Sequence, residues 1–236
     1  MTKQAEATKR AGVTRTIAAK SAASVRKSAR AGAASGESKV SARDKLLQAA
    51  VQVVRQKGYA ATSVDDLCKA AGVTKGAFFH HFASKEDLGV AAAQYWNDFT
   101  TEFFNSAPYQ QLRDPLDRVF GYIDFRRQIL QGSLEDFTCL LGTMVQEAYE
   151  TSPRIRQACD EVISVHAGRV AEDIAAAKKL YAPKADFDPQ ELALFTQVVL
   201  QGAFVLAKAK HGPELAVASV QHLRRYFEFL FGKTSN

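Results

Sequence analysis

N-capping residues recur so closely between residues 41 and 90 that this stretch is restricted to short helices joined by tight turns. Ser41, Thr62 and Ser84 are each followed three residues later by an aspartate, which is the spacing of a capping box. Apolar residues at helical intervals follow each of these pairs. Gly58 stands where the first helix should end, because glycine adopts positive φ without strain. The pattern predicts a compact group of short helices.

A turn with glycine at its centre separates two of these helices. Residues 71–73 read Ala-Gly-Val, and Thr74 is placed to cap a further helix over 75–82. Two short helices joined by such a turn form the signature of a helix-turn-helix unit. The second helix of that unit enters the major groove of DNA, which admits one α-helix. A DNA-binding function is therefore indicated.

The start of the helix over 75–82 has the chemistry for contact with a duplex. Thr74 and Lys75 lie at a helix N-terminus, where free N–H groups and the helix dipole attract phosphate. Gly76 has no side chain, so the backbone can approach DNA closely. Phe78 and Phe82 are four residues apart and are expected to pack in the core.

The histidines of this helix are expected to lie on its surface. His80 and His81 are adjacent, and adjacent positions do not share a helix face, so they are poor joint ligands for a metal ion. The sequence predicts neither a metal site nor a bound cofactor.

Three segments of this region form one extended motif: TSVDDL at 62–67, AGVTKGAFFHHF at 71–82 and KEDL at 85–88. The motif resembles the DNA-binding domain of TetR-family transcriptional regulators over about residues 41–90. One departure is Phe79, which replaces the tyrosine usual in the family and lacks its hydroxyl donor. The resemblance implies phosphate contacts from Thr62, Thr74, Phe79, His80 and Lys85, and base-edge contacts from Lys75, Gly76 and Ala77.

The rest of the chain is expected to be helical as well. Proline and glycine punctuate long apolar-periodic segments, and no useful strand-like alternation occurs. We expect helices over 84–105, 114–130, 134–150, 154–180, 190–210 and 214–231. The predicted fold is all-α, with a three-helix helix-turn-helix domain at 41–88 followed by a larger helical ligand-binding and dimerisation domain at 89–236.

Two apolar stripes stand out on the last two predicted helices. The second of them has the 4-3-4-3 spacing of a helix seam. The resemblance implies a two-fold dimer interface of four helices, made by this helix pair from each subunit. Burial of both stripes within one chain is the alternative. The predicted interface residues are Val198, Gly202, Val205, Ala216, Val220, Leu223 and Phe227.

The resemblance also implies that the middle helices enclose an effector pocket. Aromatic residues at helical spacing are more often simple core, so about a third of the candidates are expected to touch a ligand. The candidates are Trp96, Phe99, Phe103, Phe120, Tyr122, Phe125, Cys139, Met144, Tyr149 and His166.

Cys139 has a second possible role. A similar cysteine occurs in a branch of the family that senses reactive electrophiles or oxidants. Sensing requires an accessible thiolate that a cation or a helix N-terminus stabilises, and Cys139 is expected within the first two turns of its helix. The alternative is a small buried hydrophobic residue.

Charge is concentrated at the N-terminus. The formal net charge is +6, but residues 1–40 contain nine Lys or Arg against two acidic residues, so the other 196 residues carry a net −1. These 40 residues lack Leu, Phe, Tyr and Trp, so they cannot form a core, and we expect a disordered basic arm. Their composition also fits an organellar transit peptide or a solvated tail without a specific role.

The remaining composition favours a cytoplasmic protein. The three cysteines form no CxxC pair, which argues against a disulfide framework or structural zinc site and fits a reducing compartment. The longest apolar stretch, 192–207, is interrupted by polar residues and is expected to be too short and too polar to span a bilayer.

Three function classes are weighed. The leading one is a homodimeric, ligand-responsive repressor, released from a palindromic operator by a small-molecule or electrophile effector and located with the nucleoid. An enzyme is disfavoured, since the chain has no nucleophile-elbow, HExxH, P-loop or dinucleotide-binding pattern. A sequence-indifferent DNA-compacting protein, driven by the basic arm, is the third class and would bind all sequences with a similar salt dependence.

Overall fold

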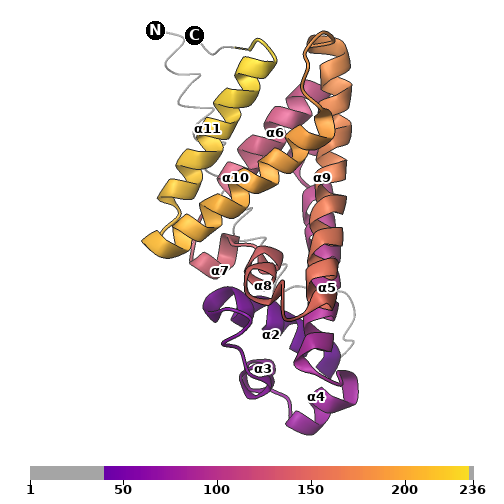
Figure 1. Cartoon of the computed structure of the whole chain (residues 1–236), viewed down its shortest axis with the longest axis vertical. Coiled ribbons are helices and arrows are strands. Elements are labelled where there is room, and N and C mark those ends of the chain that lie inside the picture. Colours follow the sequence, from indigo (N-terminus) through magenta and orange to yellow (C-terminus); the bar gives the residue numbers. More distant parts are fainter. Residues whose placement is uncertain (1–39, 234–236) are drawn as a thin grey trace. The chain divides into compact units, whose positions relative to one another are not determined.

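The computed structural model describes residues 40–233, and every regular element in that range is a helix (Figure 1). The predicted all-α fold is confirmed. The predicted basic arm lies outside the described residues except for Val40. The helices are α2 (Ala42–Lys57), α3 (Val64–Ala71), α4 (Lys75–His81), α5 (Lys85–Asn105), the 3₁₀ helix η1 (Pro108–Gln111), α6 (Pro115–Gln128), α7 (Leu134–Phe137), α8 (Leu140–Ala148), α9 (Pro153–Tyr181), α10 (Pro189–Lys210) and α11 (Glu214–Leu230).

Helices α2, α3 and α4 form a three-helix unit around one apolar cluster. Leu46, Leu67 and Phe78 are almost completely buried in it, and Phe82 is 5% exposed. Leu88 at the start of α5 belongs to the same cluster, so the three-helix unit is packed directly onto α5. The boundary predicted at residue 88 therefore falls inside a continuous helix.

The start of α3 differs from the prediction by one residue. Ser63, not Thr62, is the N-cap: its Oγ accepts from the Asp66 N–H at 3.1 Å, while the Asp66 Oδ2 accepts from the Ser63 N–H at 2.8 Å. Thr62 is 1% exposed and its hydroxyl donates to the Gly58 carbonyl oxygen at 2.5 Å. Burial of Thr62 moves the capping role to the next residue.

The other predicted N-caps in this region are confirmed, and α4 ends at His81, one residue before the predicted Phe82. Ser41 and Ser84 cap α2 and α5 through bonds from the backbone N–H three residues later. Gly72 ends α3 in the left-handed conformation with φ 64°, which a residue with a side chain rarely adopts.

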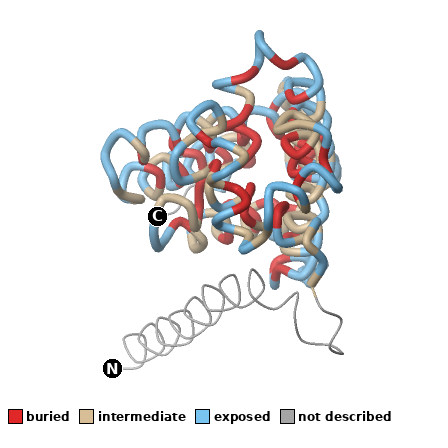
Figure 2. The backbone as a smooth tube through the Cα atoms, turned by 90° about the horizontal axis from the view of Figure 1, so that it is seen from below, coloured by how far each residue is buried: buried red, intermediate tan, exposed pale blue. Residues whose placement is uncertain are grey.

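The larger part of the chain is built on two long helices, α5 and α9. Figure 1 shows α2–α4 near one end of these helices, α6, α10 and α11 near the other, and α7 and α8 between. A second apolar cluster joins α6, α9, α10 and α11. Buried positions line the inner sides of the helices, as Figure 2 shows.

The predicted helix over 134–150 is wrong, because the chain breaks between α7 and α8. Thr138 and Cys139 have extended backbone there. The Thr138 hydroxyl donates to the Leu134 carbonyl oxygen at 2.7 Å, and Phe137 and Thr138 are both buried. Burial of these two side chains is a tertiary effect that helical periodicity does not report.

Half of the predicted dimer stripes are also wrong. Ala216, Val220, Leu223 and Phe227 of α11 are at most 4% exposed and pack inside the chain. Val198 and Val205 of α10 are exposed at 66% and 43%, and Gly202 is exposed. The α11 seam therefore holds one subunit together.

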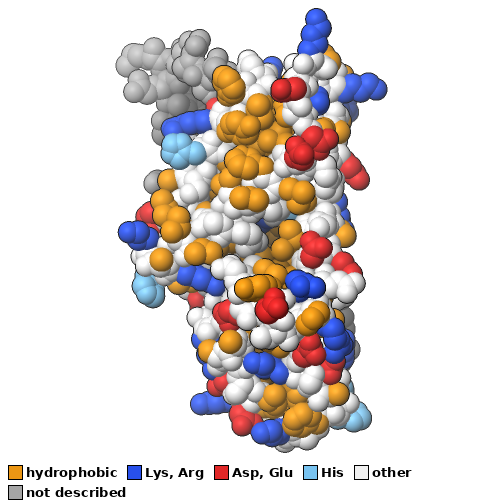
Figure 3. All heavy atoms as spheres, in the orientation of Figure 1, with side chains coloured by type: hydrophobic (Ala, Val, Ile, Leu, Met, Phe, Trp, Pro, Cys, Tyr) orange, Lys and Arg blue, Asp and Glu red, His pale blue; other side chains and the backbone are white. Residues whose placement is uncertain are grey.

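A different apolar surface is left open on these two helices, which we call the α10–α11 face. Figure 3 shows hydrophobic side chains gathering where α10 and α11 lie. The exposed residues of this face are Leu194, Phe195, Val198, Val205, Leu206, Tyr226 and Phe229.

The expectation that the apolar stretch of α10 is too short and too polar for a membrane span is wrong on both counts. Helix α10 has 22 residues and is long and apolar enough to cross a membrane, judged by length and composition alone. However, 44% of its apolar window is buried inside the chain, as in the core helix of a water-soluble protein, and this single helix is weak evidence for a span.

Candidate DNA-binding surface and effector site

The exposed side of α4 brings together most of the predicted DNA contacts. Thr74, Lys75, Gly76 and His80 are exposed, and Phe79 is 52% exposed. Ala77 is half-buried. The Thr74 Oγ accepts from the Ala77 N–H at 3.1 Å, which leaves the earlier N–H groups of this helix free to bind an acceptor. Contact of these residues with DNA stays a prediction.

Gly76 is not required by packing within the chain. A Cβ built there would meet only the Thr74 Oγ, at 3.8 Å, and no positive φ demands glycine at this position. The space in front of Gly76 is therefore open toward solvent, which suits close approach of a duplex backbone.

Lys75 has an ion-pair partner that DNA phosphates can replace. Its Nζ lies 3.0 Å from the Asp65 Oδ1, and the two side chains are 58% and 73% exposed. Such an exposed pair contributes little to stability, so the Lys75 ammonium can exchange a carboxylate for a phosphate or base.

Two of the predicted phosphate contacts do not fit the structure. The Thr62 side chain is buried and bonded to Gly58. The Lys85 Nζ is turned inward, donates to the carbonyl oxygens of Tyr59 and Thr62 at 3.1 and 3.0 Å, and lies 4.4 Å from the centre of the Tyr59 ring. Burial lowers the Lys85 pKa, opposed by the charge of Glu147. Lys85 thus fastens α5 to the α2–α3 turn.

Polar bonds connect the α7–α8 segment to α2. The Arg55 Nη1 donates to the Thr138 carbonyl oxygen at 3.2 Å, and the Gln56 amide donates to the Glu135 carboxylate at 3.1 Å. The Glu147 carboxylate accepts from the Ala60 N–H at 2.7 Å. A displacement of α7 or α8 would therefore be transmitted to the three-helix unit.

The start of α9 is fastened to the start of α5. Arg154 forms ion pairs with Asp87 at 2.8 Å and Glu86 at 3.4 Å, and the Ser152 hydroxyl donates to Glu86. The hydrogen bond and charge of Arg154, together with Ser84, lower the Asp87 pKa. The N-terminus of α5, next to α4, is thus bonded both to the α2–α3 turn through Lys85 and to the start of α9 through Glu86 and Asp87.

Several predicted effector residues form one aromatic row along α5. The ring centres of Trp96 and Phe99 are 5.9 Å apart, those of Phe99 and Phe103 are 6.3 Å apart, and Phe103 is 5.3 Å from Phe125 of α6. Phe104 continues the row to His166 at 4.8 Å. Residues of α5, α6 and α9 are thereby joined.

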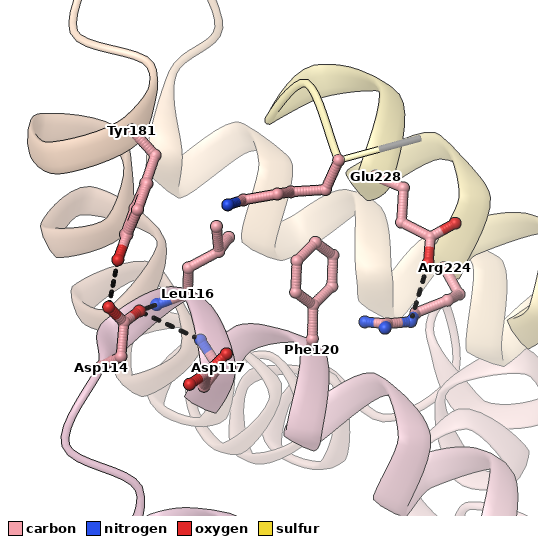
Figure 4. A pocket seen from close by; sticks show the side chains of 8 residues that line it. Asp114, Leu116, Asp117, Phe120, Tyr181, Arg224 and Glu228 are labelled. Carbon is pink, nitrogen blue, oxygen red and sulfur yellow. Dashed lines mark hydrogen bonds and ion pairs between the residues drawn. The ribbon is translucent and has the colours of Figure 1, made fainter. Parts of the chain in front are cut away.

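Other predicted effector residues lie apart from this row. Met144 is completely buried in the cluster that contains α2, and Tyr149 is 56% exposed. The Phe120 ring centre lies 4.0 Å from the guanidinium carbon of Arg224. Phe120 also lines a hollow of about 410 Å³ together with Asp114, Tyr181 and Arg224 (Figure 4). The described residues of that hollow come from α6, α9 and α11, not from the row.

Cys139 lies at the break before α8, half-buried at the N-terminus of that helix. The Arg55 guanidinium stacks 4.7 Å from the Trp96 ring, and burial lowers the Arg55 pKa to about 10, opposed by the charges of Cys139, Asp136 and Glu135. Burial also lowers the Lys208 pKa, opposed by Glu147 and Cys139. The charges of Arg55 and Lys208 therefore both act at the position of Cys139.

Burial dominates the environment of the other two cysteines. Cys68 and Cys159 are buried, and burial raises the pKa of both, that of Cys159 to about 12. Both are inert small apolar groups by these criteria. Among the described residues there is no cluster of His, Cys, Asp and Glu that would hold a metal ion.

A polar cluster lies at the other end of the aromatic row. The Tyr122 hydroxyl is 3.1 Å from the His166 Nε2, accepts from the Arg126 Nε at 3.1 Å, and accepts from the Gln197 amide at 3.1 Å. Burial, then the charges of Arg126 and Arg169, lower the His166 pKa to about 3, so this histidine is neutral near pH 7.

The cations near Cys139 and near Tyr122 carry no distinguishing signal in the sequence. Arg55, Arg126 and Lys208 are ordinary charged residues on helices, and nothing in their spacing distinguishes them from solvated positions. Gln197 interrupts an apolar stretch, which was the one available signal for a buried polar group.

Comparison with known proteins agrees with both halves of this arrangement. The pattern described as "Bacterial regulatory proteins, tetR family" matches residues 46–92, and "Transcriptional regulator LmrA/YxaF-like, C-terminal domain" matches residues 115–215.

Individual relatives are similar along most of the chain. Transcriptional regulator AcuR of Cereibacter sphaeroides is 27% identical over 79% of this chain and 85% of its own. The HTH-type transcriptional repressor DhaR of a Mycobacterium species is 26% identical over 82% and 94%. A crystal structure of regulatory protein TetR from Rhodobacter sphaeroides superposes with a TM-score of 0.67 at 26% identity, covering 80% of this chain and 98% of that one. With its helix-turn-helix unit and larger helical domain, the chain belongs to the TetR family of transcriptional regulators.

Proposed function

We propose that the protein is a homodimeric repressor that leaves a palindromic operator when a small effector binds. The observation that carries this proposal is the exposed N-terminus of α4, where Lys75 and Gly76 face solvent. Two copies of a short recognition helix read half-sites about 34–36 Å apart. The reducing cytoplasm, beside the nucleoid, is the compartment in which this activity and the free cysteines are compatible.

The α10–α11 face supports dimerisation. It presents large apolar side chains to solvent, Phe229 at 74% and Val198 at 66%. Contiguous apolar surface of this kind marks an association site. The face lies on the helix pair through which the sequence predicts the dimer, although different α11 residues form it.

Coupling between effector and operator follows from the contacts of α7, α8 and α9. A ligand that moves these helices pulls on Arg55, Ala60 and Asp87, which are next to the DNA-binding unit. A ligand that binds better to the released conformation shifts the population toward it, and operator DNA must weaken that ligand by the same factor.

The test is selection of genomic DNA fragments by the purified full-length protein, followed by affinity measurement on the recovered sequence and on a scrambled one. We expect a palindromic sequence bound at least roughly 10³-fold more tightly than the scrambled duplex. Equal affinity for both would reject a regulator and favour the DNA-compacting alternative. Removing residues 1–40 should leave the selected sequence unchanged and lower non-specific affinity.

Cys139 is proposed as the point at which an electrophile acts, supported by its position near Arg55 and Lys208. Treatment with N-ethylmaleimide should weaken operator binding of the wild type and leave Cys139→Ser unaffected. Cys68→Ser is the matched control and should respond like the wild type, because Cys68 is buried. Unchanged operator affinity in wild type and Cys139→Ser alike would remove this role.

A further inference from the structure

We propose that Arg126 is the anchor for the carboxylate of a small apolar monoanion, so that the effector class is an organic acid. This inference rests on the proposed ligand-responsive function and names the chemistry of its ligand. It comes from the charge balance of the cluster formed by Tyr122, Arg126, His166 and Gln197.

Arg126 has no acidic partner within residues 40–233. Across the described residues, Arg118 pairs with Asp173 at 2.7 Å, and Arg154 and Arg224 each pair with carboxylates. Every hydrogen-bond partner of Arg126 is neutral: the Tyr122 hydroxyl, the His166 ring and the Gln197 amide oxygen. A partly buried guanidinium with only neutral hydrogen-bond partners gains a stronger, charge-assisted partner when it binds an anion.

The hydrogen bonds of the cluster show which group donates the proton between Tyr122 and His166. The Tyr122 oxygen accepts from Arg126 and from Gln197, so its own proton is directed to the His166 Nε2. That bond requires the neutral tautomer protonated at Nδ1, in agreement with the lowered His166 pKa. The network therefore carries one positive charge, on Arg126, and no negative one.

The bonds also leave one edge of the guanidinium free. Nε and Nη2 have partners within the cluster, whereas Nη1 bonds to none of the described residues. A fork of guanidinium N–H groups matches the two oxygens of a carboxylate. The cluster offers one such fork, on Arg126, which suits a single carboxylate.

The surroundings of Arg126 are apolar. The Phe104 ring centre lies 4.6 Å from the guanidinium carbon of Arg126. The Phe103 and Phe125 rings pack against Phe104, and the Tyr109 ring packs against Phe125. A bound acid would place its carboxylate on Arg126 and its hydrocarbon part among these rings. The predicted effector residues Phe103, Tyr122, Phe125 and His166 lie in this region, which Arg126 supplies with charge.

The experiment is calorimetric titration of the full-length dimer with benzoate and butyrate, each against its uncharged amide, benzamide or butyramide. We expect saturable binding of at least one carboxylate, roughly 10- to 100-fold tighter than its amide. Arg126→Met should lose this preference. Arg127→Met removes an exposed arginine at the next position of α6 and should keep it.

The test does not depend on whether Arg126→Met folds, because the preference of the wild-type protein for the acid over its amide is decisive by itself. Equal binding of acid and amide, or no binding of either acid, overturns it. Operator affinity measured in the same samples separates the two failures: a protein that binds its operator but no acid refutes only the organic-acid effector. Arg126→Lys should retain part of the preference, since it keeps the charge and loses the fork.

Discussion

The DNA-binding unit, α2–α4, and the larger helical domain formed by α5–α11, for which we propose effector binding and which we call the effector domain, use polar side chains differently. In the DNA-binding unit, the helix N-termini are capped locally: Ser41, Ser63, Thr74 and Ser84 each accept from a backbone N–H three residues later, at exposed or partly exposed positions. In the effector domain, polar bonds join distant positions, such as Tyr122 with His166 and Gln197 with Tyr122, 44 and 75 residues apart.

This difference separates two tasks. Local caps fix short helices rigidly, so that the exposed α4 N-terminus is held ready for a duplex. Long-range bonds inside the effector domain depend on the relative positions of α6, α9 and α10, and they change whenever those helices shift. The first arrangement suits recognition, whereas the second suits a response to a ligand.

The largest effect is expected from substitutions on the α10–α11 face. They would show that the effector domain controls the affinity for DNA although it does not contact DNA. Val198→Glu with Val205→Glu places charges on an exposed apolar surface, so the dimer should dissociate. Operator affinity should fall roughly 10²- to 10⁴-fold, since the two recognition helices are no longer linked. Analytical ultracentrifugation and operator titration measure both effects.

The matched control is Leu112→Glu, which charges a residue that is 42% exposed outside this face. It should stay dimeric and keep its affinity. A double variant that remains dimeric would assign the interface elsewhere.

Gly76→Glu tests the DNA-binding unit alone. The site has room for a side chain within the protein, so stability should be unchanged, while operator affinity falls roughly 100-fold because the carboxylate repels phosphate and blocks approach. Gln221→Glu adds the same charge on α11 and should have no effect on affinity. Full affinity in Gly76→Glu would show that α4 does not enter the groove through this position.

Acid should weaken the effector domain through His166. Its pKa, about 3 in the folded chain, lies below the ordinary 6.5, so the unfolded chain binds the proton more readily between these values. The contribution of neutral His166 to the free energy of unfolding is fully present above pH 6.5. It is lost as the pH falls from 6.5 toward 3, by up to about 1.4 kcal/mol per pH unit. Urea unfolding of the wild type and His166→Gln at pH 7 and pH 5 measures it. Equal losses in both proteins would contradict this assignment.

The smallest effect is expected at a single cap. Ser63→Ala removes the acceptor for the Asp66 N–H and should lower the free energy of unfolding by about 1 kcal/mol. Ser106→Ala, outside any N-cap, is the control and should change stability less. Should the two variants unfold alike, local capping would not be what holds α3.

The sequence alone predicted the DNA-binding unit because its signals are local. A cap, a glycine turn and apolar residues at helical spacing act within a few positions, so Thr74, Gly72 and Phe78 could be assigned from their neighbours. The error at Thr62 arose because its side chain is buried and its hydroxyl donates to Gly58, four residues earlier, so Ser63 becomes the cap.

Only the tertiary structure decided the rest. The α11 stripe of Val220 and Phe227 is equally compatible with a core or an interface until the packing of α10 and α6 is known. The break at Cys139 and the unpaired charge of Arg126 likewise depend on which distant residues meet. Periodicity states that a face is apolar, but only the fold shows what covers that face and which charges inside lack a partner.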